Sequence, residues 1–304
     1  MVDLDVDGLG VLFDEVPALS GGPRTIEELP GGLTNLNLKV STPDGTYVVR
    51  LGRGDTSLLG IDRDAESFNT RAAEASGAGA PFVDYRPDLG LLVIAFVGGR
   101  SYDDADLRTP GALPRVAEAM RMLHAGPRFV NDFDMFVRQP AYLQTCAERG
   151  FPIPGDYTAY AGQFAQIRIA LAACARPTVP CNNDLLAGNI VDDGERIWLI
   201  DYDYAGNNDA FFELGNTWTE CELDEEHLAE LVTAYIGHEA PQLVARARLQ
   251  ATVSRYGWAL WGFIQAGRST DDFDYRAWGQ ERFDKAVADF RSPGFGALLD
   301  EAAS

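Results

Sequence analysis

The sequence predicts an α+β fold with two lobes, an antiparallel sheet in the N-lobe and a mainly helical C-lobe. Up to about residue 94, short apolar or alternating runs are separated by turn signals, which is typical of antiparallel strands. After Gly98-Gly99 the apolar residues recur at helical spacing. We therefore expect the N-lobe to span residues 1–94 and the C-lobe to span residues 95–304. The sequence shows neither an internal repeat nor a flexible linker, so the lobes should share an interface.

The first predicted strand pair begins with a glycine-containing loop. The segment LPGGLTNLNLKV covers residues 29–40, a turn follows at Pro43-Asp44-Gly45, and a second strand covers Thr46–Leu51. Glycines let the backbone approach a ligand closely, and asparagine and threonine side chains can donate to phosphate oxygens. A strand–turn–strand unit of this kind covers the nucleotide in kinases. The candidate nucleotide-binding residues of this loop are Gly31, Gly32, Thr34, Asn35 and Asn37.

A helix and two more strands complete the predicted N-lobe. The helix should run from Asp62 to about Ala75, because glycines follow it closely. Residues 81–85 and 91–97 indicate two strands joined by a turn at residues 87–90, and we place the hinge between the lobes at residues 95–99.

Arg50 and Glu66 form a candidate ion pair inside the N-lobe. Arg50 ends the second predicted strand, and Glu66 lies near the start of the predicted helix. In protein kinases a strand cation neutralises the nucleotide phosphates and pairs with a helix glutamate, so this order of residues favours the same function here. The alternative is a surface ion pair that contributes little stability.

The C-lobe should contain several helices around one central stretch. Apolar spacing and flanking glycines or prolines predict helices over Pro114–His124, Tyr142–Arg149, Tyr157–Ala175 and Glu222–Ile236.

The central stretch, residues 181–216, predicts a β-hairpin with polar residues at both outer ends. Two apolar runs, residues 189–191 and 196–200, flank the turn signal Asp192-Asp193-Gly194. Asp184 and Asn189 come before the hairpin, and Asp201 and Asp203 follow it, so an antiparallel pairing should bring all four together. Carboxylate and carboxamide oxygens suit magnesium and leave one spare base, which fits phosphoryl transfer from a magnesium nucleotide. The alternative is that Asp184 and Asn189 merely stabilise a turn.

Four aromatic residues near the C-terminus share one spacing. Trp258 and Trp261 lie three residues apart in RYGWALWGFIQA, and Tyr275 and Trp278 repeat that interval. Ordinary core packing explains most aromatic stripes. Two neighbouring helices could instead form a box for a quaternary ammonium group, which aromatic rings bind through their quadrupoles.

The net charge and the amino-acid composition argue against several classes of binding partner. The net charge of −21 argues against nucleic-acid binding and against adhesion to anionic membranes. The sequence has no apolar run of membrane-spanning length and no signal-peptide pattern at its N-terminus, so we expect no membrane insertion. The four cysteines show no C-x-x-C pairing, which favours reduced thiols in a cytoplasmic protein. The oligomeric state stays unknown at this point.

Three groups of residues resemble one known family. Asn182-Asn183-Asp184 with Asn189, then IDYDY at residues 200–204 and FELGN at residues 212–216, follow the catalytic block of the choline/ethanolamine kinases and aminoglycoside phosphotransferases. The loop GGLTNLN and the C-terminal tryptophan pair also match the choline kinase pattern. The resemblance covers nearly the whole chain past Leu29. It implies a protein-kinase-like fold and ATP-dependent phosphorylation of an alcohol, with ATP and Mg²⁺ as cofactors.

The resemblance also implies a role for each site residue. Asp184 would be the catalytic residue that accepts the hydroxyl proton, and Asn189 and Asp201 would hold magnesium. Arg50, placed by Glu66, would neutralise nucleotide phosphates. The implied substrate-binding residues are Asp203, which would attract a cation, and the aromatic residues Trp258, Trp261, Tyr275 and Trp278.

The implied substrate is a small cationic amino alcohol, choline or ethanolamine. An aminoglycoside or another small-molecule phosphotransferase is the first alternative, and a catalytically inactive nucleotide-binding pseudokinase is the second. Asn182 prompts the second, because it stands where the family usually has histidine. Glu213 replaces an aspartate, and Asp209 falls near a position where choline kinases tend to have an aromatic ring, which could open the box.

Overall fold

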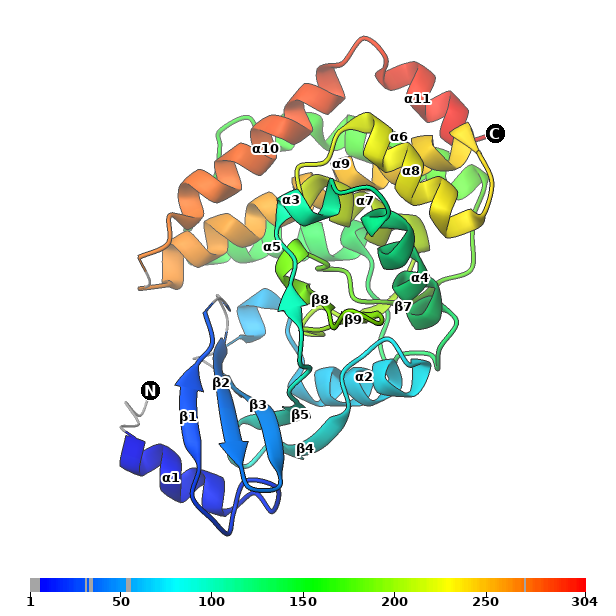
Figure 1. The fold of residues 1–304 in the computed structure, drawn as a ribbon. Helices are drawn as coiled ribbons and strands as arrows, with labels where there is room; N and C mark the ends of the chain where they lie inside the picture. Colours follow the sequence, from blue (N-terminus) through cyan, green and yellow to red (C-terminus); the bar gives the residue numbers. More distant parts are fainter. Residues whose placement is uncertain (1–5, 31, 33–34, 53–55, 271) are drawn as a thin grey trace.

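The N-lobe is built on a five-stranded sheet in the computed structural model, which describes residues 6–30, 32, 35–52, 56–270 and 272–304 (Figure 1). All neighbouring strands are antiparallel, in the order β1-β2-β3-β5-β4. Arg50 on β3 pairs with Asn37 on β2 and Leu92 on β5, which fixes its place in the sheet. The strands are β1 Thr25–Glu28, β2 Asn35–Thr42, β3 Gly45–Gly52, β4 Phe82–Arg86 and β5 Leu91–Ala95.

Two helices accompany this sheet. Helix α1, Val6–Asp14, contributes Phe13 to a small core that it shares with the sheet residues Val40, Val49 and Val93. Helix α2, Arg63–Ser76, begins where the Asp62 carboxylate accepts two backbone N–H groups. These contacts satisfy donors that a helix start otherwise leaves unpaired. The α2 bounds agree with the sequence prediction, whereas α1 was not predicted.

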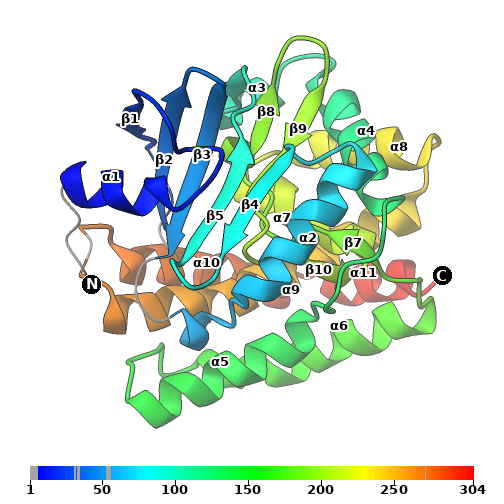
Figure 2. The same ribbon diagram turned by 90° about the horizontal axis from the view of Figure 1, so that it is seen from below.

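The C-lobe is mainly helical, as predicted, and α9 is its longest helix in the described part of the chain (Figure 2). Helix α9 has 28 residues and packs against helices on several sides, so most of its length is buried. The α-helices are α3 Asp104–Leu107, α4 Ala112–His124, α5 Met135–Arg149, α6 Ala161–Ala173, α7 Ala210–Glu220, α8 Glu225–Ile236, α9 Pro241–Arg268, α10 Tyr275–Arg291 and α11 Phe295–Ala302. Short 3₁₀ helices are η1 Ser57–Leu59, η2 Tyr157–Tyr160 and η3 Ala187–Asn189.

The predicted hairpin is present between α6 and α7. Strands β8, Ile190–Asp192, and β9, Ile197–Leu199, pair in antiparallel register, with Ile190 opposite Leu199. Gly194 has φ +92°, a backbone conformation that favours glycine and allows the tight turn. Strand β6, Arg100–Ser101, pairs with β8, and strand β7, Val179–Cys181, pairs with β10, Gly206–Asn208.

The two lobes contact each other directly, and the predicted fold class is confirmed. The Leu199 N–H donates to the Ala78 carbonyl oxygen at 2.9 Å, which connects β9 to the end of the N-lobe helix. Strand β5, the last of the large sheet in sequence, ends at Ala95. The lobe boundary after residue 94 stays a prediction. Within the described ranges, the model contains no helix that is both long and apolar enough to cross a membrane.

Candidate active site

The loop between β7 and β8 holds its residues in one conformation. Asn183 has φ 67°, a left-handed conformation that is uncommon in non-glycine residues and that asparagine tolerates better than most. Its amide Nδ2 donates to the carbonyl oxygens of Cys181, Tyr204 and Gly206 at 3.1 to 3.2 Å. The side chain is completely buried. Asn183 therefore determines the path of the chain directly before Asp184.

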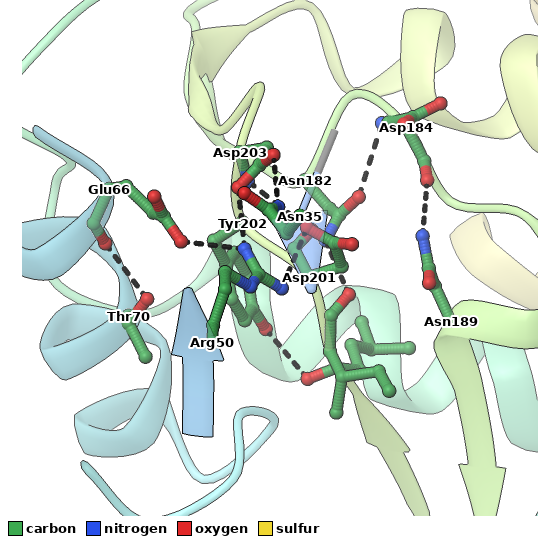
Figure 3. Close-up of polar contacts among 12 residues, drawn as sticks. Asn35, Arg50, Glu66, Thr70, Asn182, Asp184, Asn189, Asp201, Tyr202 and Asp203 are labelled. Atoms are coloured by element: carbon green, nitrogen blue, oxygen red, sulfur yellow. Dashed lines mark hydrogen bonds and ion pairs between the residues drawn. The ribbon is translucent and has the colours of Figure 1, made fainter. Parts of the chain in front are cut away.

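Asn182 connects this loop to the end of the hairpin. Its Oδ1 accepts the Asp184 N–H at 3.1 Å, and its Nδ2 donates to the carbonyl oxygens of Ile200 and Asp201 at 3.1 and 2.8 Å. Asn189 closes the loop on its other side by donating Nδ2 to the Asp184 carbonyl oxygen at 2.9 Å (Figure 3). The asparagine at the family's histidine position thus supports the loop with three hydrogen bonds.

Asp201 and Asp203 follow β9 and face the N-lobe. Asp201 also has a left-handed backbone, with φ 65°. Arg50 reaches across from β3 and lies 2.9 Å from the Asp201 carboxylate, 2.5 Å from Asp203 and 2.6 Å from Glu66 (Figure 3). The predicted Arg50–Glu66 pair is present, and both side chains are largely buried rather than exposed at the surface.

Arg63 is a second cation of the site that sequence reasoning missed. It lies 2.6 Å from Glu66 and 2.9 Å from Asp203, and its Nη2 donates to Asn35 Oδ1 at 2.7 Å. Asn35 Nδ2 donates to Asp203 at 2.8 Å. Asp203 therefore contacts two arginines and one asparagine. Arg63 lies three residues before Glu66 on the same helical face, and this spacing is the signal that could have identified it.

Acidic groups outnumber basic groups in this cluster. Burial and the nearby Asp201, Glu220 and Asp203 raise the pKa of the Asp184 carboxyl group to about 8. Burial opposes the charge of Arg50, but the surrounding carboxylates outweigh that effect and raise its pKa. Four carboxyl groups meet two guanidinium groups, an excess of two acids that suits a divalent cation. The cluster consists of Arg50, Arg63, Glu66, Asp184, Asp201 and Asp203.

The donor set fits magnesium. Asp184 and Asp201 offer carboxylate oxygens, and Asn189 donates its Nδ2 to the Asp184 carbonyl oxygen, so its Oδ1 could bind a metal ion. All three line the same cavity, and hard oxygen ligands of this kind are those that magnesium prefers.

The glycine-containing loop is described only in part. Gly31 and Thr34 lie outside the described residues. Gly32 has φ +86°, and a side chain there would come within 2.7 Å of Asn37 Nδ2 and 3.1 Å of the Asn35 carbonyl oxygen. Glycine is therefore the residue that fits this close turn beside the cavity. Asn37 Oδ1 is buried and has no hydrogen-bond partner among the described residues.

One cavity of about 460 Å³ joins the predicted phosphotransfer residues to the predicted substrate residues. Trp258, Trp261 and Trp278 line it, whereas Tyr275 is absent from its lining. The members predicted from sequence that line this cavity are Gly32, Asp184, Asn189, Asp201, Asp203, Trp258, Trp261 and Trp278. The structure thus brings residues from both lobes and from both ends of the sequence to one place.

Trp261 packs on Trp278 and on Tyr275, so the two tryptophan rings form part of one wall of the cavity rather than a box around it. The Trp261 ring centre lies 5.2 Å from that of Trp278 and 5.8 Å from that of Tyr275, which are contact distances. Tyr275 therefore supports Trp261 from outside the cavity. Trp261 donates its Nε1–H to the Tyr204 hydroxyl at 2.6 Å, and Tyr204 meets the edge of Trp258.

Four further charged residues of the cavity wall were missed, namely Asp103, Asp104, Glu220 and Arg282. Glu220 ends α7, and Arg282 on α10 donates two hydrogen bonds to it, one of them 3.2 Å long. The Arg282 guanidinium also lies over the Trp278 ring, 3.4 Å from its centre. Glu220 follows Glu213 by seven residues, so helical spacing could have placed it on the same face of α7.

Asp209 does not line the cavity. Its carboxylate accepts the N–H of Phe211 at the start of α7 and pairs with the buried Arg246 of α9. The expectation that Asp209 opens the aromatic box is therefore wrong, because this side chain joins two helices of the core.

Comparison with known proteins agrees with this geometry. Residues 25–250 match the phosphotransferase enzyme family. A protein named probable ethanolamine kinase from Arabidopsis thaliana is 25% identical to this chain over 87% of its length and 79% of the relative's. A solved structure of a choline/ethanolamine kinase family protein from Mesorhizobium loti is 29% identical, covers 98% of both chains and has a TM-score of 0.86. Choline kinase LicA from Streptococcus pneumoniae is 20% identical, with 92% and 98% of the two chains covered and a TM-score of 0.78, and thus shares the fold.

The family match spans most of the chain, and the relatives named kinases cover nearly all of it. The predicted enzyme class, a phosphotransferase that acts on an alcohol, is therefore confirmed. The relatives that it resembles over most of its length include proteins named ethanolamine kinase and choline/ethanolamine kinase family protein, and the chain belongs to the phosphotransferase enzyme family.

Proposed function

We propose that this enzyme transfers the γ-phosphoryl group of magnesium ATP to the hydroxyl group of a small cationic amino alcohol, choline or ethanolamine. The observation that carries this proposal is the shared cavity, in which Asp184, Asn189 and Asp201 lie together with Trp258 and Trp261. A hydroxyl group near Asp184 and an ammonium group near the tryptophans can occupy such a cavity at the same time. The similarity to choline and ethanolamine kinases supports the same substrate class.

Asp184 would accept or orient the proton of the substrate hydroxyl. Its raised pKa of about 8 lies close to neutral pH, which is the useful range for a general base. Asn189 and Asp201 would hold magnesium, which when bound supplies positive charge to the phosphate oxygens. The Asn182 side chain hydrogen-bonds to the backbone of both Asp184 and Asp201, which keeps these two residues at a fixed separation. This support of the catalytic loop favours an active enzyme over a pseudokinase.

Arg50 and the glycine-containing loop would bind the nucleotide. Arg50 is oriented by Glu66 and Asp203, so its guanidinium is already in place to neutralise phosphate charge. Gly31, Gly32, Thr34, Asn35 and Asn37 belong to the loop that would cover the phosphates.

The ammonium group of the substrate would lie beside the tryptophan wall. Trp258, Trp261 and Trp278 supply ring surface, and Glu220 supplies a carboxylate in the same cavity. Tyr275 would act by supporting Trp261. Asp203 was predicted to attract this cation, but its pairing with Arg50 and Arg63 favours a role in placing those arginines.

A coupled assay of ADP release tests the proposal directly. Wild-type enzyme with magnesium ATP would be offered choline, ethanolamine, kanamycin and a neutral alcohol of similar size. We expect turnover with choline or ethanolamine, and a loss of kcat of at least about 100-fold in Asp184→Ala with nucleotide binding retained. Turnover with kanamycin alone, or an Asp184→Ala variant as active as wild type, would contradict the proposal.

A further inference from the structure

A buried histidine that the proposed reaction does not use contacts the support of the catalytic loop. His124 lies in the last turn of α4. Its Nε2 lies 3.2 Å from Oε1 of Glu213 on α7, and its Nδ1 lies 2.7 Å from the hydroxyl oxygen of Tyr235 on α8. The second Glu213 oxygen, Oε2, accepts the backbone N–H of Asn183 at 3.0 Å. One carboxylate thus connects three helices to the residue that precedes Asp184.

The peptide held by Glu213 is a sensitive part of the loop. It joins Asn182 to Asn183, and Asn183 has the left-handed φ of 67°. Such a conformation is unfavourable for most non-glycine residues, so neighbouring contacts help to fix it. Asn182 in turn accepts the Asp184 N–H at 3.1 Å. A shift of this peptide would therefore move Asp184 relative to the substrate hydroxyl.

Glu213 needs a donor on its other oxygen. The residue is 0% exposed, and a buried carboxylate is destabilising unless hydrogen bonds or a positive charge compensate it. His124 meets this need through Nε2, while the Tyr235 hydroxyl fixes the ring from the opposite side.

Cys181 lies beside His124 and Glu213, and its thiol is better suited to hydrogen bonding than to metal binding. Its sulfur lies 3.7 Å from His124 Nε2, so a histidine, a cysteine and a glutamate come together. Burial and the nearby Glu213 raise the pKa of the Cys181 thiol, and its sulfur lies 3.8 Å from the Asn208 carbonyl oxygen, within donating distance. A metal ligand would have to be the thiolate.

We propose that His124 is a positioning residue of this phosphotransferase, which acts through Glu213 to fix the Asn183 peptide and thereby the Asp184 carboxyl group. The inference rests on the proposed function in one respect, namely that Asp184 serves the transfer. It assigns to α4 a role in catalysis that does not involve contact with either substrate.

Two substitutions of His124 separate donation from packing. Leucine fills the space without a donor, whereas glutamine can present an amide N–H close to the position of Nε2. We expect His124→Leu to lower kcat by at least about tenfold while the KM values for ATP and the amino alcohol change by less than about threefold. His124→Gln should restore kcat to within about threefold of wild type.

Hydrogen–deuterium exchange of the peptide that covers residues 181–189 provides a readout independent of turnover. Exchange should be faster in His124→Leu than in wild type and should return toward the wild-type rate in His124→Gln. His227→Leu is the matched control, because it removes a histidine that lies 2.7 Å from the Asp224 carboxylate on the surface of α8. It should change neither kcat nor the exchange of this peptide.

Three outcomes would overturn the proposal. The first is wild-type kcat and exchange in His124→Leu, the second is a glutamine variant as impaired as the leucine variant, and the third is an equal loss in His227→Leu. If His124→Leu does not fold, Tyr235→Phe provides the test, with an expected loss of kcat of about threefold and an unchanged kcat as the contradicting result. An inactive wild-type enzyme would instead refute the proposed function, and the exchange experiment would still decide the role of His124.

Discussion

Arg50 Nη2 lies 2.9 Å from Asp201 Oδ1, so a cation of the N-lobe sheet contacts a proposed magnesium ligand of the C-lobe. The contact crosses between the lobes, and the same guanidinium reaches Asp203 and Glu66. Nucleotide and magnesium would therefore enter a site whose charges are already arranged. Such preorganisation lowers the cost of orienting charges during the reaction.

The first prediction concerns this guanidinium. Arg50→Lys should raise the KM for magnesium ATP by about tenfold or more, because one ammonium group cannot replace a planar fork that contacts three carboxylates. Steady-state kinetics at saturating amino alcohol provide the measurement. Arg100→Lys is the control, since the exposed Arg100 pairs with Asp106 rather than with a residue of the site. An unchanged KM in Arg50→Lys would contradict the role of Arg50.

The second prediction concerns the stability of the ligand-free enzyme as a function of pH. Because the pKa of Asp184 is raised from 3.8 to about 8 in the folded state, the unfolded chain loses this proton at lower pH than the folded chain does. Stability contributed by the neutral carboxyl group is thus lost progressively as pH rises. Asp184→Asn should become more stable than wild type by up to about 1.4 kcal/mol for each pH unit between pH 4 and pH 8.

Urea unfolding at pH 5 and pH 8 measures this difference. Asp193→Asn, on the hairpin turn, is a control in which the pKa shift has the opposite direction. Hydrogen bonds from Trp198 and from backbone groups lower the pKa of Asp193. Stability from that carboxylate is present at neutral pH and is lost as pH falls, so Asp193→Asn should be less stable than wild type at pH 8. A stability gain in Asp184→Asn that is equal at both pH values would contradict the assignment of the raised pKa.

The sequence predicted four of the five N-lobe strands, because they alternate and are separated by strong turn signals, whereas β1, Thr25–Glu28, was not predicted. The extent of α9 could not be predicted in the same way. Helix α9 is buried along most of Pro241–Arg268, so its apolar residues do not mark one face, and only the part around Trp258 and Trp261 was identified. Helix α1 was missed for a related reason, since its core contact depends on sheet residues far along the chain.

The site residues also divide into those that a local sequence pattern indicates and those that depend on distant contacts. Asp184, Asn189 and Asp201 could be identified because a local hairpin sets their spacing and brings them to one cavity. Arg63 and Glu220 were missed, because helical spacing from Glu66 and Glu213 indicates only a shared helix face. Their place in the site depends on partners distant in sequence, Asp203 for Arg63 and Arg282 for Glu220. Spacing within one element is visible in a sequence, whereas proximity between elements is not.

The third prediction concerns the buried pair of Asp209 and Arg246. Arg246 donates its Nε to Asp209 at 2.8 Å and its Nη1 to the carbonyl oxygens of Leu171 and Cys174 at 3.1 Å. Asp209→Ala leaves a buried guanidinium without its counter-ion and should lower the free energy of unfolding by about 3 kcal/mol or more. Denaturant unfolding measures the loss.

The double variant Asp209→Ala with Arg246→Met is the decisive comparison. Because it removes both charges, it should be more stable than Asp209→Ala alone. A double variant that loses the sum of the two single losses would show that the pair does not interact. Arg248→Met is the control for arginine removal from α9, since Arg248 makes a half-exposed pair with Glu225 at 3.1 Å.

The fourth prediction concerns Trp278, whose ring lies against Trp261 on the cavity wall and carries Arg282 3.4 Å from its centre. Trp278→Leu removes ring surface beside the proposed ammonium position and should raise the KM for the amino alcohol about 2- to 30-fold, with the KM for ATP unchanged. Trp198→Leu is the matched control, because Arg196 covers that ring at the same 3.4 Å distance outside the cavity. Equal effects of the two substitutions would mean that the tryptophan wall does not bind the substrate cation.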